Sequence, residues 1–143
     1  MNNLHNDSVI VLDTHILIWY LEGIKLDERQ IQIIEDARKQ NNLYICAISI
    51  WEIGMLANKG KIAFSINVKE WINRMLAIPG LRTIDLSSDI LLESTNLPNY
   101  AYKDPVNRLI IASTRSINAY LMTMDEKIIE YGNSGYIRLV DNK

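Results

Sequence analysis

Residues 8–21 read SVIVLDTHILIWYL, and this stretch decides how the rest of the chain is arranged. The continuous apolar run at residues 9–12 is typical of a strand that is buried on both faces of a parallel sheet. The run ends on Asp13, and apolar residues then return at helical spacing. A carboxylate between a buried strand and a helix lies at the carboxyl edge of the sheet, where ligands bind in open α/β folds. Asp is also a good helix N-cap, so Asp13 alone supports capping and a functional role about equally.

The composition is that of an ordinary globular protein: 143 residues, 48% apolar, 22% charged, with a net charge of -2. A chain of this length buries a sizeable core, so we expect residues 1–143 to form a single domain. Cys46 is the only cysteine, which excludes a disulfide framework and favours a cytoplasmic location. We expect neither a signal peptide nor a membrane span, because no run has the required pattern or length. Since the chain is slightly acidic, affinity for phosphate must come from local basic residues or a bound metal ion.

Apolar runs alternate with amphipathic segments along the whole chain. Further strands are expected at residues 43–48, 81–86, 120–124 and 136–140. Helices are expected at residues 27–41, 49–59, 67–77, 87–96, 104–119 and 126–131, the last of them stopped by Gly132. Asp27 and Gln30 have the spacing of a capping box. Strands alternating with helices predict an α/β fold with a central, mainly parallel sheet that helices cover on both faces.

Four carboxylates fall at comparable places in this arrangement. Asp13 and Asp125 each end a buried strand and begin a helix. Glu52 lies in the first turn of the helix that Ser49 opens, at capping-box spacing, and Asp104 opens a later helix. For each acid taken alone, capping is the favoured interpretation. Capping does not require the acids to share one edge of a sheet, so the four together indicate a common site.

Carboxylates gathered in one cleft repel one another unless protons or a cation compensate their charge. Because no cluster of His or Cys accompanies them, the ligand set favours a hard ion, Mg²⁺ or Mn²⁺, over zinc. Ions held in this way serve phosphodiester hydrolysis by activating water and neutralising the attacking and leaving oxygens. The candidate catalytic and metal-binding residues are therefore Asp13, Glu52, Asp104 and Asp125.

Four stretches of the chain resemble the signature blocks of one protein family. They are VLDTHILIW (residues 11–19), AISIWEI (47–53), DPVNRLIIAS (104–113) and LMTMDEKIIEYG (121–132). In this order they resemble the PIN-domain toxins of the VapC type, over nearly the whole chain. The resemblance implies a three-layer α/β/α PIN-like fold and Mg²⁺- or Mn²⁺-dependent cleavage of RNA. It also implies inhibition by a cognate antitoxin protein and assembly as a homodimer.

The resemblance also assigns individual residues. Asp13, Glu52 and Asp125 match acids that hold the metal in the family, and Thr123 matches a hydroxyl residue of the last block. The third block departs from the family, because Asn107 stands where members commonly have an acid.

The amide of Asn107 can offer a carbonyl oxygen to a metal, but it contributes no charge and cannot act as a base. We therefore expect weaker metal binding and a slower reaction than in members that keep the acid. Asp104 lies three residues earlier on the same helical face and can partly substitute for the missing carboxylate.

Several other residues near these blocks have two open interpretations. Arg108 either contacts substrate phosphate or orients a neighbouring carboxylate. His15 suits acid–base work, although packing beside the site is the favoured interpretation. Four aromatic side chains are expected in the core, or in a groove for an antitoxin helix or a homodimer: Trp19, Tyr20, Trp51 and Trp71.

The sequence leaves two main functional hypotheses. The first is an endoribonuclease that is the toxin of a toxin–antitoxin pair. The second is a catalytically weak or inactive PIN-like protein that binds an antitoxin and acts in regulation, a hypothesis that Asn107 keeps open. An aspartyl-phosphate enzyme is disfavoured, because such an enzyme needs a Lys at the end of a late strand. In this chain, the late strand expected at residues 120–124 is followed by Asp125 instead.

Overall fold

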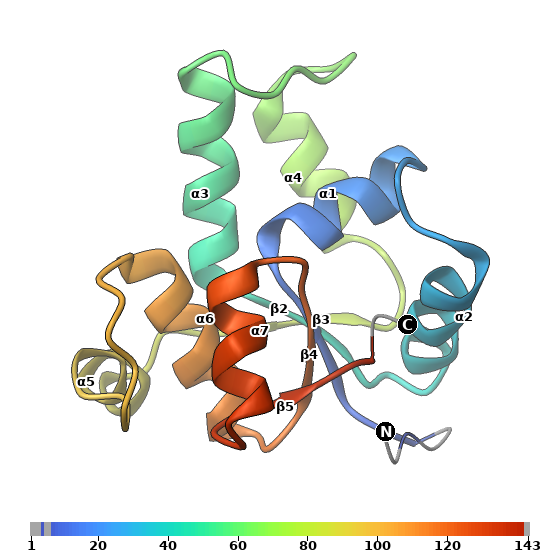
Figure 1. Cartoon of the computed structure of the whole chain (residues 1–143). Helices are drawn as coiled ribbons and strands as arrows, with labels where there is room; N and C mark the ends of the chain where they lie inside the picture. The colour runs from blue at the N-terminus through green and yellow to red at the C-terminus, as the bar shows by residue number, and fades with distance from the viewer. Residues whose placement is uncertain (1–3, 5–6, 142–143) are drawn as a thin grey trace.

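The structure is a computed structural model and describes residue 4 and residues 7–141. Within these residues, five parallel strands form one sheet in the order β3-β2-β1-β4-β5 (Figure 1). The strands are β1 (Ile10–Leu12), β2 (Leu43–Cys46), β3 (Leu81–Ile84), β4 (Tyr120–Met122) and β5 (Arg138–Leu139). The α/β class with a parallel sheet, predicted from the alternation of strands and helices, is confirmed.

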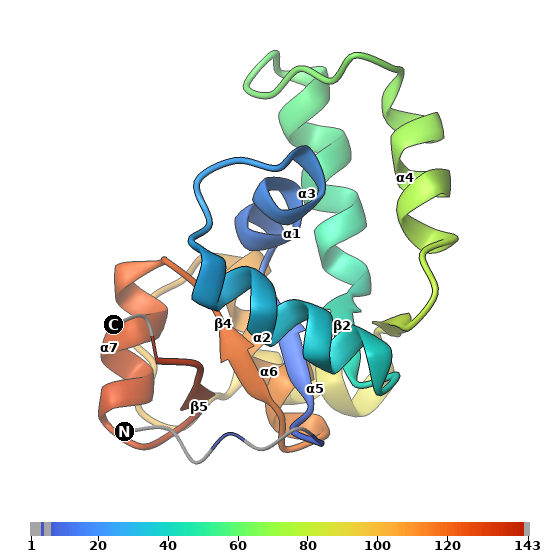
Figure 2. The same cartoon turned by 90° about the vertical axis from the view of Figure 1, so that its right-hand side faces the viewer.

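Helices cover both faces of the sheet. The helices in the described residues are α1 (Thr14–Glu22), α2 (Glu28–Lys39), α3 (Ala47–Asn58), α4 (Val68–Leu76), α5 (Ser88–Thr95), α6 (Pro105–Ser116) and α7 (Glu126–Asn133). Helices α5, α6 and α7 lie on one side of the sheet, and α2 lies on the other. Helices α3 and α4 run side by side and extend beyond the sheet, as two views at right angles show (Figure 2).

The buried core has two parts, one on each face of the sheet, and β1 contributes to both. Val11 packs with residues of α5, α6 and α7, whereas Ile10 and Leu12 pack with residues of α1, α2 and α4. Each of these three strand side chains is at most 1% exposed. The continuous apolar run of β1 is therefore explained by burial on both faces.

Several helix starts match the sequence prediction. Asp27 and Gln30 form the expected capping box at the start of α2. Asn67 and Ser87 cap α4 and α5, and Asp104 caps α6 with a proline in the first turn. Across the described residues, no helix has the length and apolar content needed to cross a membrane.

Several elements end two or three residues away from their predicted bounds, and two of these differences have a clear structural cause. Helix α3 begins at Ala47, directly after β2, so Ser49 does not open it. Ser49 is instead buried inside the helix, where its hydroxyl accepts a hydrogen bond from the Thr14 hydroxyl at 2.9 Å. Glu52 consequently lies in the second helical turn, and the expected capping pair with Ser49 is wrong.

The second difference is at Gly132, which was expected to stop the last helix. Helix α7 continues through Gly132 to Asn133. A Cβ atom on this glycine would lie 2.3 Å from the side chain of Leu139. The glycine therefore permits close packing of β5 on α7, and it does not end the helix.

Candidate functional site

A pocket of about 290 Å³ lies at the carboxyl ends of β1 and β4. Seven polar side chains from different parts of the chain line it: Asp13, Thr14, His15, Glu52, Asp104, Asn107 and Asp125. They reach it because parallel strands place their carboxyl ends, and the helices that follow, at one edge of the sheet. The four acids singled out in the sequence therefore border the same space, while their role as metal ligands stays a prediction.

Asp13 is the most buried of these acids, with 8% of its surface exposed. Its Oδ1 accepts the backbone N–H of Ile16 at 3.0 Å, and its Oδ2 accepts the hydroxyl of Thr123. Burial raises the pKa of Asp13 to about 6, and the charge of Asp125 acts weakly in the same direction. The hydrogen bonds from Thr123 and Ile16 oppose this rise. Asp13 thus caps α1 and also presents a carboxylate that is costly to keep ionised.

Asp125 caps α7 with one oxygen and faces the pocket with the other. Its Oδ1 accepts the backbone N–H groups of Lys127 and Ile128 at 2.9 and 3.1 Å. Its Oδ2 accepts the side-chain amide of Asn107 at 3.2 Å. The Asp125 N–H donates to the hydroxyl of Thr123 at 3.0 Å, so Thr123 links the two acids.

Glu52 on α3 and Asp104 at the start of α6 are the other two acids that line the pocket. Glu52 is partly buried, and no described residue forms a hydrogen bond or ion pair with its carboxylate. Asp104 is exposed at the rim, where its Oδ1 accepts the N–H of Val106 at 2.9 Å. The hydrogen bond between Thr14 and Ser49 fixes α3 against α1, and so sets the position of Glu52.

The donor set fits a hard divalent cation. Within the described residues, no three His, Cys, Asp or Glu side chains are already grouped closely enough to hold a metal ion. Apart from His15, the polar side chains that line the pocket offer only oxygen ligands, and the Oδ2 atoms of Asp13 and Asp125 retain lone pairs beyond the hydrogen bonds given above. Among the described lysines and arginines, none forms an ion pair with these acids. The uncompensated carboxylates and the oxygen ligands fit Mg²⁺ or Mn²⁺.

Arg108 forms no ion pair with a carboxylate of the pocket, and its contact with substrate phosphate stays a prediction. Its guanidinium donates to three backbone carbonyl groups, those of Ser94, Tyr100 and Tyr102, at 3.0, 2.8 and 2.8 Å. It also lies over the Tyr100 ring, 5.4 Å from the centroid. Arg108 therefore holds the segment that leads into α6, because its donors are engaged away from the carboxylates.

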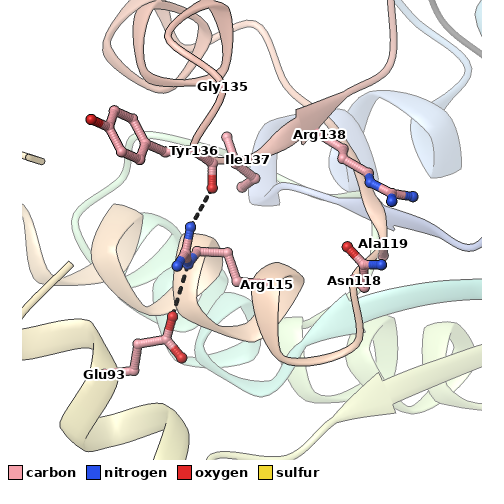
Figure 3. A pocket seen from close by; sticks show the side chains of 8 residues that line it. All are labelled: Glu93, Arg115, Asn118, Ala119, Gly135, Tyr136, Ile137 and Arg138. Atoms are coloured by element: carbon pink, nitrogen blue, oxygen red, sulfur yellow. Dashed lines mark hydrogen bonds and ion pairs between the residues drawn. The ribbon is translucent and has the colours of Figure 1, made fainter. Parts of the chain in front are cut away.

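A larger pocket, of about 420 Å³, lies at the opposite end of β4 and is not the candidate site. Its carboxylate, Glu93, is paired with Arg115, which also donates to the carbonyl oxygen of Tyr136 (Figure 3). These bonds join α5, α6 and the approach to β5. The larger pocket lacks a cluster of acids like that of the candidate site, so pocket volume does not identify the functional site of this protein.

Comparison with known proteins identifies the family. The family profile described as PIN domain matches residues 10–133. The chain belongs to the PIN domain family. This PIN domain is 28% identical to ribonuclease VapC22 of Mycobacterium tuberculosis over 122 residues, which span 85% of this chain and 90% of that protein.

Solved structures share the fold of this PIN domain at low sequence identity. VapBC2 from Rickettsia felis, bound to a DNA fragment from its promoter, is 17% identical with a TM-score of 0.67. That match covers 92% of this PIN domain and 97% of the other chain. FitAcB from Neisseria gonorrhoeae is 14% identical with a TM-score of 0.65, covering 93% and 97% of the two chains. The PIN-like fold expected from the sequence blocks is thereby confirmed.

The sequence pointed to every acid of the pocket, but it gave no role to Tyr100. Tyr100 is buried and lines a neighbouring pocket, together with Tyr102, Lys127 and Tyr131. A tyrosine in an irregular segment before a helix carries no periodic signal. Only the packing of that segment brings its ring against Tyr131 and under the guanidinium of Arg108.

Proposed function

We propose that this PIN domain is a divalent-metal-dependent endoribonuclease and the toxin of a toxin–antitoxin pair. The observation that carries the proposal is the pocket at which Asp13, Glu52 and Asp125 meet. Its relative VapC22 is named a ribonuclease, and a similar structure from Klebsiella pneumoniae is a toxin–antitoxin complex. Phosphodiester hydrolysis suits a cluster of carboxylates that can hold a hard divalent cation.

Each polar residue of the pocket has a distinct role in the proposed reaction. A bound Mg²⁺ or Mn²⁺ supplies positive charge for the phosphate and lowers the pKa of water. Asp13 and Asp125 hold the cation, and Thr123 fixes the distance between them through its two hydrogen bonds. The Glu52 carboxylate, which no described residue engages, accepts the proton of the attacking water. Asn107 contributes an oxygen ligand without charge.

The proposed partners are an RNA substrate, a cognate antitoxin and a second copy of the chain, all in the cytoplasm. Trp51 on α3 is 56% exposed and Leu92 on α5 is 69% exposed. Both side chains are accessible to a protein partner, and burial of either in an interface would remove apolar surface from water. Trp51 therefore fits the groove interpretation better than the core interpretation.

Cleavage of RNA by the purified protein tests the proposal. We expect cleavage with Mg²⁺ or Mn²⁺, loss of cleavage with a chelator, and a loss of at least about 100-fold for Asp125→Asn. Asp27→Asn is the matched control, since Asp27 also caps a helix but lies outside the pocket. Equal, metal-independent cleavage by all three proteins would contradict the proposal.

A second candidate function is a regulatory PIN domain with little or no catalysis. Asn107 favours it, because the site has one negative charge fewer than the family pattern. This candidate predicts a stable complex with the antitoxin and no cleavage at any Mn²⁺ concentration. Cleavage by the parent therefore separates the two candidates. If the parent does not cleave, Asn107→Asp shows whether the rest of the site is competent, since only a competent site would gain cleavage from the added carboxylate.

A further inference from the structure

The pocket that Tyr100 lines has a volume of about 410 Å³ and no role in the function proposed above. Its walls come from two segments, residues 99–102 ahead of α6 and residues 127–136 on α7 and just after it. We call it the tyrosine pocket, because four tyrosine rings line it: Tyr100, Tyr102, Tyr131 and Tyr136. Its volume falls within the range of pockets that hold small organic ligands.

The walls of the tyrosine pocket are held in place before any ligand binds. Tyr100 packs edge-on against Tyr131, with centroids 4.9 Å apart, and Tyr131 stacks on Tyr136 at 5.0 Å. Arg108 donates to the carbonyl groups of Tyr100 and Tyr102, both at 2.8 Å. Because the aromatic rings and the backbone are already fixed, a ligand loses little affinity to the ordering of its site.

The tyrosine pocket is connected to the acid pocket by two short stretches of chain. Tyr102 lies two residues before Asp104, and Lys127 lies two residues after Asp125. Cα atoms two residues apart are at most about 7 Å from each other. The N–H group of Lys127 also donates to the Asp125 carboxylate at 2.9 Å. A polymer whose phosphate reaches the acids can therefore place a neighbouring unit in the tyrosine pocket.

The charges around the tyrosine pocket favour a neutral aromatic ligand over a cation. Lys127 Nζ lies 5.0 Å from the centroid of the Tyr102 ring, and the Arg108 guanidinium lies 5.4 Å from that of Tyr100. A lysine or arginine from a protein partner would meet these like charges. A nucleobase is flat and uncharged, and it stacks on aromatic side chains.

The pocket also offers polar groups that suit a nucleotide. Lys127 is exposed, and its long side chain can turn from the Tyr102 ring to a phosphate. Glu130 lines the pocket, and its carboxylate can accept hydrogen bonds from the N–H groups of a base. Tyr102 is half-buried and is the tyrosine of the pocket nearest in sequence to the acids.

We propose that the tyrosine pocket binds an unpaired nucleobase of the RNA substrate, with Tyr102 stacked on the base and Lys127 on a phosphate. The inference rests on the proposed function, because it presumes that the acid pocket acts on RNA. It narrows the substrate to RNA with an unpaired nucleotide near the bond that is cut. A base inside a duplex would have to leave its stack at a cost in free energy.

Binding of single-stranded RNA in a chelator tests the inference without metal-dependent cleavage. The probe is a fluorescein-labelled RNA hexamer of random sequence, and its fluorescence anisotropy reports the affinity. We expect Tyr102→Leu to weaken binding at least about fivefold, the effect of one stacked base. Tyr102→Phe should bind as the parent does, since it keeps the ring. Lys127→Gln should reduce the slope of log affinity against log salt by about 0.7, the effect of one phosphate contact.

Tyr44 and Arg82 provide matched controls. Tyr44 is half-buried, and the Arg82 guanidinium lies over its ring, 5.1 Å from the centroid, but both lie outside the residues that line the tyrosine pocket. Tyr44→Leu and Arg82→Gln should leave RNA binding unchanged. A hexamer of abasic sugar phosphates carries the charge of the probe without its bases. The parent and Tyr102→Leu should bind this hexamer equally well, because no base remains to be stacked.

Photochemical cross-linking of the parent keeps the inference testable if Tyr102→Leu does not fold. The same hexamer, with 5-iodouridine in place of uridine, is irradiated with the protein in a chelator. Mass spectrometry should then locate the cross-links in residues 99–102 or 127–136. Cross-links confined to other residues would overturn the inference.

The outcomes separate this inference from the proposed function. If the parent does not bind the hexamer, or if Tyr102→Leu binds it as tightly as the parent does, the tyrosine pocket holds no base. An equal loss of affinity for the RNA and the abasic hexamer would also overturn the inference, while metal-dependent cleavage still decides the proposed function. If the parent binds RNA through Tyr102 but cuts none with Mn²⁺, the proposed function fails and the tyrosine pocket stands as an RNA-binding site.

Discussion

The hydroxyl of Thr123 donates a hydrogen bond to the carboxylate of Asp13, from a residue 110 positions later in the sequence. The same hydroxyl accepts the N–H of Asp125 at 3.0 Å. A single side chain thus joins the carboxyl ends of β1 and β4 and fixes the spacing of two acids. Both Thr123 and Asp13 are buried, so water competes little for this bond.

The first prediction concerns the pH dependence of stability in the metal-free protein. The pKa of Asp13 rises from 3.8 to about 6 on folding, mainly by burial. Between these values the native state binds more protons than the unfolded state, so the free energy of unfolding falls as the pH rises. Asp13→Asn should therefore stabilise the protein above pH 6 by about 1–2 kcal/mol, after allowing for weaker hydrogen bonds.

Thermal unfolding in a chelator, at several pH values, measures this effect. The advantage of Asp13→Asn should shrink as the pH falls from 6 toward 4. Asp27→Asn is the control, because its carboxylate caps α2 outside the acid pocket. A lower melting temperature for Asp13→Asn at pH 8 would mean that capping of α1 outweighs the cost of the buried charge.

The parts of the structure that follow from local sequence could be predicted. The buried run of β1, the capping box at Asp27 and the Asp–Pro start of α6 depend on residues within one or two turns. The acids could be grouped because parallel strand ends share one edge of the sheet.

The remaining features depend on contacts that form only when the chain folds back on itself. Ser49 suits a cap locally, but it lies inside α3 because Thr14 provides its partner. Gly132 suits a helix end locally, but Leu139 packs onto it. Arg108 suits a phosphate ligand, but nearby backbone carbonyls engage it. Such contacts become visible only once the fold is known.

The second prediction concerns the segment that leads into α6. Arg108→Lys removes the planar guanidinium that reaches three carbonyls, and a lysine replaces at most one of these bonds with good geometry. We expect a loss of about 2–4 kcal/mol in the free energy of unfolding, measured by urea denaturation. We also expect faster proteolysis in residues 97–104.

Arg74→Lys is the control for Arg108→Lys. Arg74 forms an exposed ion pair with Glu70 at 2.9 Å within α4, and such pairs contribute less than about 1 kcal/mol. If the two variants lose the same free energy of unfolding, the hydrogen bonds from Arg108 to the carbonyls stabilise the protein no more than an exposed ion pair does.

The third prediction compares two glycines inside helices. Gly54→Ala in α3 should stabilise the protein by about 0.5–1 kcal/mol, because a Cβ there meets no atom within 4 Å and alanine favours helix. Gly132→Ala should instead destabilise by about 1–3 kcal/mol, since its Cβ overlaps the Leu139 side chain. Urea denaturation of both variants measures the difference, and a gain for Gly132→Ala would show that β5 readily moves away from α7.

The last prediction concerns the charge of the candidate metal site. Asn107→Asp replaces the amide that donates to Asp125 with a second carboxylate, so the metal-free protein should melt at a lower temperature. The same change adds a charged ligand, so Mn²⁺ binding should tighten about tenfold or more and any RNA cleavage should accelerate. Asn118→Asp is the control for net charge, because Asn118 borders the other pocket, at the opposite end of β4. If Asn107→Asp and Asn118→Asp both bind Mn²⁺ with the affinity of the parent, residue 107 is not a metal ligand. The family pattern then does not apply to this chain at position 107.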